Sequence, residues 1–345
     1  MTIATTGGTF AAENEPAFMT TRPSSPSAFT VVRDRDPVPE RIAGAFVAIG
    51  NFDGVHRGHR AVIDAAIVHA RREAKPAIAL TFEPHPRAFF QPDRPLFRLT
   101  PEASKLKLLA AAGLDGAVVM TFGAELAKVT ADAFVADILI RHLGIAGAVA
   151  GADFHFGKGR QGTPAFLREE GNARGFAVDL IPPFLVDGKP VSSSEIRAAL
   201  SHGEVERANT LLGYPWFAGG KVIHGEARGR SLGFPTANIV LDPACALAHG
   251  IYAVRVLAKG AIYDGVASFG RRPTFGEGAP LLEIYLFDFS GDLYGEEIVA
   301  AFIGWIRPEL KFDSADDLVQ RMNEDSRLAR EKLARAAGAF PPIRG

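Results

Sequence analysis

The chain has 345 residues, with 38 Lys and Arg, 39 Asp and Glu, and a formal net charge of −1. This length predicts two domains, because a single hydrophobic core rarely organises more than about 250–300 residues. The even charge balance excludes a general electrostatic attraction to nucleic acid or to an anionic membrane, so any ligand must be bound by local charge.

The N-terminal 40 residues are rich in Thr, Ala, Ser and Pro. They fit neither a signal peptide nor a transit peptide, and they predict a disordered tail. No apolar run approaches the roughly 20 residues that span a bilayer. The single cysteine, Cys245, cannot form an internal disulfide, which fits a protein of the reducing cytosol. A catalytic thiol is the less favoured alternative for this residue. We therefore expect a soluble cytoplasmic protein that binds neither membrane nor nucleic acid, and leave a homo-oligomer open.

Residues 41–213 alternate short apolar runs with longer segments of helical period, and this pattern predicts one domain. Because strands alternate with helices, the pattern favours an α/β domain with a parallel sheet and helices on both faces. The predicted strands cover 45–50, 77–82, 116–122, 146–154 and 176–181, and the predicted helices cover 59–73, 103–113 and 132–143.

Residues 214–345 change to short strands separated by turns, and predict a second domain. A mainly antiparallel β-barrel closes so many short strands most naturally. A final amphipathic helix, from about Ser314 to Ala336, should pack on the barrel. The predicted strands cover 220–227, 250–258, 261–270, 280–289 and 296–306.

The segment GNFDGVHRGH, residues 50–59, joins the first predicted strand to the first predicted helix. Its glycines let the backbone turn tightly, and the start of a helix attracts phosphate. His56 and His59 are three residues apart and face the same way, so their imidazoles could stabilise charge on a phosphate. The alternatives are an ordinary strand-to-helix turn, or a metal site, for which a third ligand at helical spacing is missing.

GNFDGVHRGH resembles the HxGH signature of nucleotidyltransferases, and its longer form resembles the adenylyltransferase half of the bacterial bifunctional riboflavin kinase/FMN adenylyltransferase family. TFEPHP (81–86), GADFHFG (151–157) and SSSEIR (192–197) match further motifs of that half in the same order. The resemblance implies a Rossmann-like nucleotidyltransferase domain in which His56, His59 and Arg197 are catalytic. It also implies ATP and phosphate contacts at Gly50, Asn51, Phe52, Asp53, Gly54, Gly58, Ser193 and Ser194, and flavin contacts at Pro84, His85, Asp153 and Phe154.

From the residues alone, SSSEIR indicates a helix start with Ser192 and Glu195 spaced as a capping box. A second motif competes for the role of nucleotide site. GKGRQG (157–162) matches the G-x-G-x-x-G dinucleotide fingerprint and has Asp179 downstream. It follows the fourth predicted strand instead of the first, so a lid over phosphates or plain surface charge is the better interpretation.

GKVIHGEARGRSLGFPTANI, residues 220–239, is the most distinctive segment of the second half. Gly229 and Gly233 permit close backbone approach, and Thr236 and Asn238 offer neutral oxygens of the kind that Mg²⁺ accepts beside phosphate oxygens. The alternative is that PTAN is an ordinary turn.

The same segment resembles the riboflavin kinase signature of the family, and 265–275, 281–289, 292–295 and 306–314 match it further along. The resemblance implies that Glu283 is the base that activates the ribityl 5′-hydroxyl, and that Thr236 and Asn238 hold Mg²⁺. It implies ATP contacts at Gly225, Gly229, Arg230 and Gly233 and flavin contacts at Arg307 and Glu309. Ser268 stands where the family often has Asn, which puts a flavin contact from that position in doubt.

Together, the two halves predict an enzyme that phosphorylates riboflavin to FMN and then adenylylates FMN to FAD, with ATP as co-substrate in both steps and Mg²⁺ as cofactor. The alternatives are an enzyme that retains one of the two activities, and a flavin- or nucleotide-binding regulator. An aminoacyl-tRNA synthetase would share HxGH chemistry, but the chain has no KMSKS-like segment.

Overall fold

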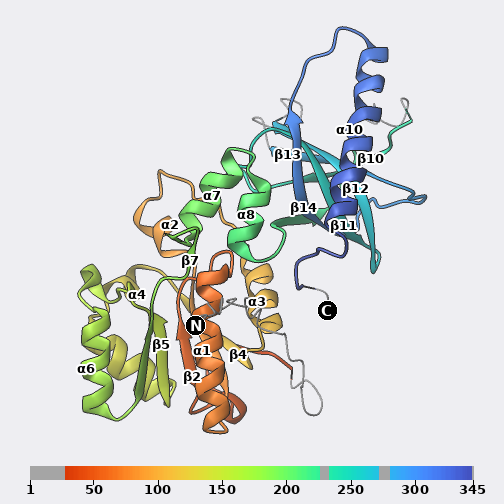
Figure 1. The fold of residues 1–345 in the computed structure, drawn as a ribbon. Coiled ribbons are helices and arrows are strands. Elements are labelled where there is room, and N and C mark those ends of the chain that lie inside the picture. Colours follow the sequence, from red (N-terminus) through yellow and green to blue (C-terminus); the bar gives the residue numbers. More distant parts are fainter. Residues whose placement is uncertain (1–27, 226–232, 272–279, 344–345) are drawn as a thin grey trace, which may run out of the picture.

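The computed structural model describes residues 28–225, 233–271 and 280–343. Figure 1 shows two lobes: an α/β lobe formed by the first part of the chain, and a barrel lobe that carries the long helix α10, with helices α7 and α8 between them. Among the described residues, no helix has both the length and the apolar character that a bilayer crossing requires.

The α/β lobe is built on a six-stranded sheet in the order β1-β4-β3-β2-β5-β6, in which every pair is parallel. β2 therefore lies between β3 and β5, at the point where the strand order reverses. The strands are β1 (Thr30–Arg33), β2 (Phe46–Ile49), β3 (Ala77–Glu83), β4 (Gly116–Thr121), β5 (Gly147–Gly151) and β6 (Ala177–Ile181), and a small hairpin, β7 (Leu185–Val186) with β8 (Lys189–Pro190), follows.

Helices cover both faces of this sheet, as predicted. Alternate residues of each strand point to opposite faces, so Phe46 and Ala48 pack with α1 and α3, whereas Val47 and Ile49 pack with η2 and α6. The helices of the lobe are η1 (Glu40–Ile42), α1 (Arg57–Arg72), α2 (Pro86–Phe90), α3 (Glu102–Ala111), α4 (Ala124–Lys128), α5 (Ala131–Ala133), η2 (Phe134–His142, a π-helix), η3 (Lys158–Arg160) and α6 (Pro164–Arg174).

Part of the predicted tail is not disordered. Within residues 28–40, the strand β1 pairs in parallel with β4, and Val32 is buried in the core of the lobe. The prediction is wrong for this segment because four residues, TVVR, are too short to show a clear period, and their strand forms only against β4. The rest of the predicted tail, residues 1–27, lies outside the described residues.

The barrel lobe is a sheet in the order β10-β13-β12-β11-β14-β9, with every pair antiparallel. A bridge between Ile223 and Asn238 joins its two ends, which completes the mainly antiparallel barrel that the sequence predicts. The elements are β9 (Phe217–Lys221), β10 (Thr236–Val240), β11 (Gly250–Ala258), β12 (Ala261–Arg271), β13 (Pro280–Leu286), β14 (Glu297–Pro308) and α10 (Ala315–Arg335).

One prediction and one alternative for this lobe are wrong in detail. The first strand covers Phe217–Lys221, whereas the predicted strand was 220–227, of which 226–227 lie outside the described residues. The alternative that PTAN is an ordinary turn is wrong, because Thr236–Asn238 begin β10. Gly233 and Pro235 indicate a turn, and the turn ends where β10 pairs with β13. Strand pairing with a segment some 45 residues away overrides the local signal.

α10 begins after its N-cap Ser314 and packs on the outer face of the barrel, as predicted. Arg307 on β14 and Asp325 on α10 form a buried, bidentate ion pair, with Nη2 2.6 Å from Oδ2. At the C-terminal end of α10, Arg255 donates to the carbonyl oxygens of Leu333, Ala336 and Ala339. These contacts fix the middle and the C-terminal end of the helix against the sheet.

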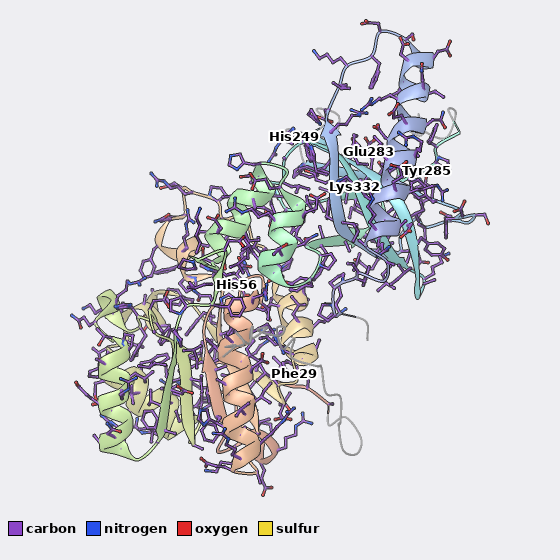
Figure 2. The ribbon with its side chains drawn as sticks, in the orientation of Figure 1. Phe29, His56, His249, Glu283, Tyr285 and Lys332 are labelled. Atoms are coloured by element: carbon purple, nitrogen blue, oxygen red, sulfur yellow. The ribbon has the colours of Figure 1, made fainter. Side chains whose placement is uncertain are left out.

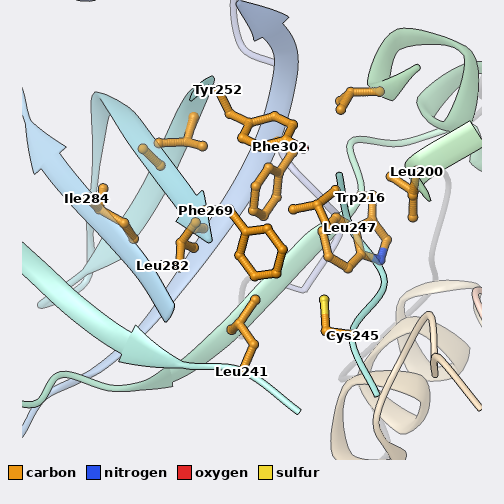
Figure 3. Close-up of a cluster of buried hydrophobic side chains, with 14 of the residues drawn as sticks. Leu200, Trp216, Leu241, Cys245, Leu247, Tyr252, Phe269, Leu282, Ile284 and Phe302 are labelled. Atoms are coloured by element: carbon orange, nitrogen blue, oxygen red, sulfur yellow. The ribbon is translucent and has the colours of Figure 1, made fainter. Parts of the chain in front are cut away.

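Helices α7 (Ser193–Ser201) and α8 (Val205–Leu212) join the lobes. Their buried side chains, including Ile196 and Leu200, belong to the same apolar cluster as the barrel interior, and Trp216 connects the two sets. Figure 3 shows Leu200, Trp216 and Cys245 gathered around Phe269 and Phe302 of the barrel. The lobes therefore share one core, and the predicted boundary at residue 213 falls inside it and stays a prediction.

Candidate active sites

Four predicted motifs meet at one edge of the α/β sheet. GNFDGVHRGH follows β2, TFEPHP covers the last three residues of β3 and continues past it, and GADFHFG begins at the last residue of β5. All three therefore lie at the carboxyl ends of adjacent strands. The start of α7 joins them, because Ser193 Oγ donates to the carbonyl oxygen of Asp53 at 2.9 Å. This is the switch point of strand order, where open α/β sheets bind their ligands.

His56 and His59 lie at the start of α1 with their rings stacked, 3.6 Å between centroids and 17° between planes. His56 is the N-cap of α1, and its Nδ1 accepts from the His59 backbone N–H, which places the proton of a neutral imidazole on Nε2. Nδ1 of His59 is buried without a hydrogen-bond partner among the described residues. A neutral imidazole carries one N–H, which donates to a phosphate oxygen, whereas binding of a metal ion would use the lone pair of a ring nitrogen.

Both rings are neutral near pH 7. Burial lowers the pKa of His56 to about 4, with a smaller contribution from the positive charge of Arg197. Burial also lowers the pKa of His59 well below 6.5, and His56 and Lys105 add to the effect. His85 follows the same rule, because burial lowers its pKa to about 4. Each ring can therefore donate one N–H to a ligand without carrying a charge of its own.

The backbone between β2 and α1 is strained and tightly held. Phe52 (φ 51°), Gly54 (φ 85°) and Val55 (φ 36°) all have positive φ, which for Phe and Val is a costly conformation. A Cβ on Gly54 would also come within 2.9 Å of Leu99, and one on Gly58 would come within 3.2 Å of the His56 ring. The loop therefore needs glycine at position 54, and a side chain at position 58, in the first turn of α1, would press on the His56 ring.

Asp53 holds this loop and does not present its carboxylate to a ligand. The side chain is 1% exposed and accepts from the backbone N–H groups of Leu99 and Thr100, while Arg197 forms an ion pair with it. A phosphate contact from Asp53 can therefore come only from its backbone. Phe52 is equally buried, with its side chain in the core of the lobe.

Two residues at the start of the barrel lobe reach the same loop. The hydroxyl of Tyr214 donates to the carbonyl oxygen of Gly54, and burial raises the pKa of Tyr214, so this donor stays protonated. The indole Nε1 of Trp216 donates to the carbonyl oxygen of Leu99 at 3.0 Å. No local pattern indicates these contacts, because the partners lie more than 100 residues apart in the chain.

Around TFEPHP the structure adds charged residues that the sequence analysis missed. Glu83 accepts from Arg98 at 2.7 and 3.0 Å and lies 2.6 Å from Nζ of Lys105. Burial opposes ionisation of Glu83, but the hydrogen bonds from Arg98 and Lys105 lower its pKa overall. Of these three charged residues, only Glu83 lies within the TFEPHP motif, where it immediately precedes Pro84.

The predicted flavin contacts of this lobe lie on the same edge. His85 caps α2, where its Nδ1 accepts from the Arg87 backbone N–H at 3.1 Å. Phe89 and Phe90 on α2 are 38% and 63% exposed and lie edge-to-face against Phe122. Phe154 stacks on Phe156, Asp153 is exposed, and Ser194 is exposed at the start of α7.

The dinucleotide alternative finds no support at GKGRQG. Residues 157–162 form a turn closed by a pair of backbone hydrogen bonds between Phe156 and Gly162. Asp179, the proposed ribose acceptor, lies 2.9 Å from Nε2 of His69 on α1. A catalytic role for the Cys245 thiol is also unsupported, because the residue is buried and burial raises its pKa to about 11.

The second predicted site lies in the barrel lobe, well separated from His56, as the labels in Figure 2 show. The antiparallel register places Asn238 opposite Glu283 and Glu283 opposite Ser268, so these three side chains form a row on one face of the sheet. Thr236 lies on the same face, opposite Tyr285. Directly opposed side chains in such pairs have Cβ atoms about 4.5–5.5 Å apart.

Asn238 has the geometry of an oxygen ligand. The residue is 4% exposed, its Nδ2 donates to the Thr236 carbonyl oxygen at 3.3 Å, and its Oδ1 has no partner among the described residues. A Cβ on Gly225 would come within 2.5 Å of Nδ2, so this glycine makes room for the amide. His224, beside it, stacks on Tyr294 with 3.8 Å between centroids, a pair that the sequence analysis missed.

The predicted flavin contacts of the barrel are not equivalent. The guanidinium of Arg307 is bound to Asp325 and to the carbonyl oxygen of Pro308, so it anchors α10. The carboxylate of Glu309 lies beside β12, where a Cβ on Gly270 would come within 2.5 Å of Oε1. Gly233 precedes β10 with φ 86°, whereas Gly229 and Arg230 lie outside the described residues.

The α/β lobe has a parallel sheet covered on both faces, with His56 and His59 at the point where the strand order reverses. The barrel lobe has the row that contains Asn238 and Glu283. Together, these two sites define a transferase that acts on nucleotide phosphates. The family model for FAD synthetase matches residues 38–195, and the model for riboflavin kinase matches residues 212–333. Three curated relatives carry the name bifunctional riboflavin kinase/FMN adenylyltransferase. They come from Escherichia coli K12 (38% identity, 84% of this chain, 92% of the relative), Haemophilus influenzae (39%, 84%, 94%) and Bacillus subtilis (36%, 85%, 93%).

The chain therefore belongs to the bifunctional riboflavin kinase/FMN adenylyltransferase family, and it is an enzyme with a kinase and a nucleotidyltransferase domain. A crystal structure described as a macrolide-efflux protein from Streptococcus pneumoniae has the same fold, with a TM-score of 0.78 and 31% identity over 87% of this chain and 98% of that one.

Acid should destabilise the α/β lobe through its buried histidines. Folding lowers the pKa of His56 from 6.5 to about 4, so below pH 6.5 the unfolded chain binds a proton that the folded chain does not. Stability should fall as the pH drops from 6.5 to 4, by about 3 kcal/mol for His56 alone at 1.36 kcal/mol per pKa unit. Urea unfolding at pH 7 and pH 5 measures this. His56→Asn, which keeps a cap acceptor, should show a smaller pH difference, and an unchanged difference would contradict the assignment.

Proposed function

We propose that this chain phosphorylates riboflavin to FMN in the barrel lobe and adenylylates FMN to FAD in the α/β lobe, with one ATP consumed in each step. The observation that carries the proposal is the pair of separate sites: stacked, neutral histidines at a phosphate-binding helix start, and an Asn238–Glu283 row on a sheet face. The product of the barrel site, a phosphate monoester, is the nucleophile that the α/β site requires.

In the barrel lobe, Glu283 takes the proton of the ribityl 5′-hydroxyl as its oxygen attacks the γ-phosphorus of ATP, and ADP leaves. Thr236 and Asn238 would hold Mg²⁺, and the Oδ1 of Asn238, which has no partner within the described ranges, fits this role. When bound, the ion neutralises charge on the phosphate oxygens. Ser268 lies next to Glu283 in the row and offers a hydroxyl to the substrate.

In the α/β lobe, an oxygen of the FMN phosphate attacks the α-phosphorus of ATP, and pyrophosphate leaves. His56 and His59 donate N–H groups to the charge that develops, beside the backbone N–H groups at the start of α1. Arg197 uses Nε and Nη2 on Phe97 and Asp53, so Nη1 is the donor that we assign to a phosphate oxygen. No covalent enzyme intermediate is required.

Exposed aromatic rings support the flavin assignment at this site. Phe89 and Phe90, on the helix that begins after His85, form a cluster with Phe122, which follows β4. Exposed apolar surface of this kind marks a binding surface. A flat isoalloxazine ring stacks on such side chains. Asp153 and Phe154, on the loop after β5, would contact the same flavin. The cytoplasmic location and a homo-oligomer stay predictions.

A time course tests the proposal. Purified protein incubated with riboflavin, ATP and Mg²⁺ should produce FMN first and FAD later, as measured by chromatographic separation of the flavins. EDTA in excess over Mg²⁺ should stop FMN formation, because Thr236 and Asn238 supply no charge of their own to neutralise the phosphates. Unchanged riboflavin with metal present would overturn the proposal, and supplying FMN instead would show whether only the second activity is retained.

A further inference from the structure

Lys105 on α3 is a buried ammonium group at the edge of the adenylylation site. Its side chain is 1% exposed, and its Nζ lies 2.6 Å from Oε1 of Glu83. The same Nζ donates to Thr81 Oγ1 at 3.0 Å and to the carbonyl oxygen of Asn51 at 3.3 Å. A buried charge is costly unless it is paired and hydrogen-bonded, and every one of these partners lies on β3 or on the loop after β2.

The Asn51 carbonyl oxygen is the point where these contacts converge. Thr81 Oγ1 donates to it at 3.1 Å, so this one oxygen accepts from both Thr81 and Lys105. Asn51 immediately precedes Phe52, the first residue with positive φ in the strained loop. Strained backbone persists only where the surroundings over-determine it, and these two donors hold the loop at its start.

Lys105 also sets the charge beneath the histidines. Three cations, Lys105, Arg98 and Arg197, surround two carboxylates, Glu83 and Asp53, as a connected network. With three positive and two negative groups, the network has a net charge of +1, and removal of Lys105 would lower this net charge to zero. The groups that act on His59 are His56, Lys105, His85 and Arg197, and the charge of Lys105 lowers its pKa.

We propose that Lys105 is a positioning residue for adenylyl transfer: it holds the Asn51 carbonyl, and with it the start of the loop that carries His56 and His59, in the geometry that receives the phosphates of ATP. The role rests on the adenylylation step proposed for this lobe. Lys105 need not touch ATP, because it acts through the loop.

The test is Lys105→Met, which keeps the length of the side chain and removes the charge and the donors. The FMN-to-FAD rate should fall about 10²-fold, because a small misplacement of catalytic groups costs this much. The riboflavin-to-FMN rate in the same sample should not change, which reports a folded protein. Lys107→Met is the matched control, since Lys107 is exposed on the same helix and should retain both rates.

A second variant keeps the test decisive if Lys105→Met does not fold. Thr81→Val removes the hydroxyl that donates to the Asn51 carbonyl and accepts from Lys105, with little change of shape and no loss of charge. It should lower the FMN-to-FAD rate about tenfold, the order of effect of a typical hydrogen bond. Unchanged adenylylation in Thr81→Val and in a folded Lys105→Met would overturn the proposal. Equal losses of both reactions in Lys105→Met would also overturn it, because they indicate a merely structural lysine.

The pH profile separates charge from packing. Without Lys105, the pKa of His59 rises, so the acid limb of the FMN-to-FAD profile should move to higher pH in Lys105→Met. Thr81→Val and Lys107→Met should leave the limb in place. An unmoved limb in Lys105→Met would contradict the electrostatic part of the proposal. If the unmodified protein converted no FMN to FAD, the assignment of adenylylation itself would fail first, which distinguishes the two.

Discussion

Replacing Glu283 with glutamine is expected to lower the rate of FMN formation by about 10²–10⁴-fold, the usual contribution of a general base. The amide keeps the size of the side chain and its place in the row between Asn238 and Ser268, but cannot accept the hydroxyl proton. Conversion of FMN to FAD by the same sample should be unchanged, because the histidine site lies in the other lobe. The measurement is the initial rate of each step with riboflavin or with FMN as substrate.

A matched control for this variant is Glu297→Gln, at the exposed start of β14 and away from the row. It should retain both rates. Two outcomes would sink the assignment of Glu283: FMN formation at the normal rate in Glu283→Gln, or loss of both reactions in a folded protein.

The reciprocal variant, His59→Ala, is expected to lower FMN-to-FAD conversion by about 10²–10³-fold, as the loss of one preorganised donor does in other acyl and phosphoryl transfer sites. His59 stacks on His56, and its buried Nδ1 has no hydrogen-bond partner among the described residues, so the substitution breaks no structural hydrogen bond at this nitrogen within that part of the chain. FMN formation should be unaffected. The same paired assay measures both rates.

His59→Gln should retain part of the lost activity, because the amide supplies an N–H donor close to the position of the ring. His202→Ala, at the exposed end of α7, is the control and should retain both rates. Normal adenylylation in His59→Ala would remove the histidine pair from the mechanism and leave the helix start as the main phosphate contact.

Local patterns predicted the elements that a short window can encode. The alternation of apolar runs and helical periods located the central strands and α1, and an amphipathic pattern predicted the last helix from about Ser314, which is the N-cap of α10. The family resemblance implied that His56, His85 and Ser193 contact the ligands of one domain, and the structure brings them to one edge of the sheet, where the carboxyl ends of neighbouring parallel strands meet. The register then placed Glu283 beside Asn238.

The remainder depends on contacts between distant residues. Arg307 was assigned to flavin because of its motif, but its partner Asp325 comes from a helix whose packing no local pattern encodes. Lys105 looks like a surface lysine in ASKLKLL, and only the fold brings Glu83 and the Asn51 carbonyl to it. Asp53 was assigned to phosphate, yet the N–H groups of Leu99 and Thr100 take up its oxygens.

The core shared by α7, α8 and the barrel has an evolutionary consequence. Ile196 and Leu200 lie on the helix that follows Ser193, yet they pack with Trp216 and the barrel interior. A substitution that improves packing around one catalytic centre therefore changes the support of the other. Selection on either reaction constrains both, and the two halves of the gene cannot be exchanged independently with those of a distant homologue without repacking this junction.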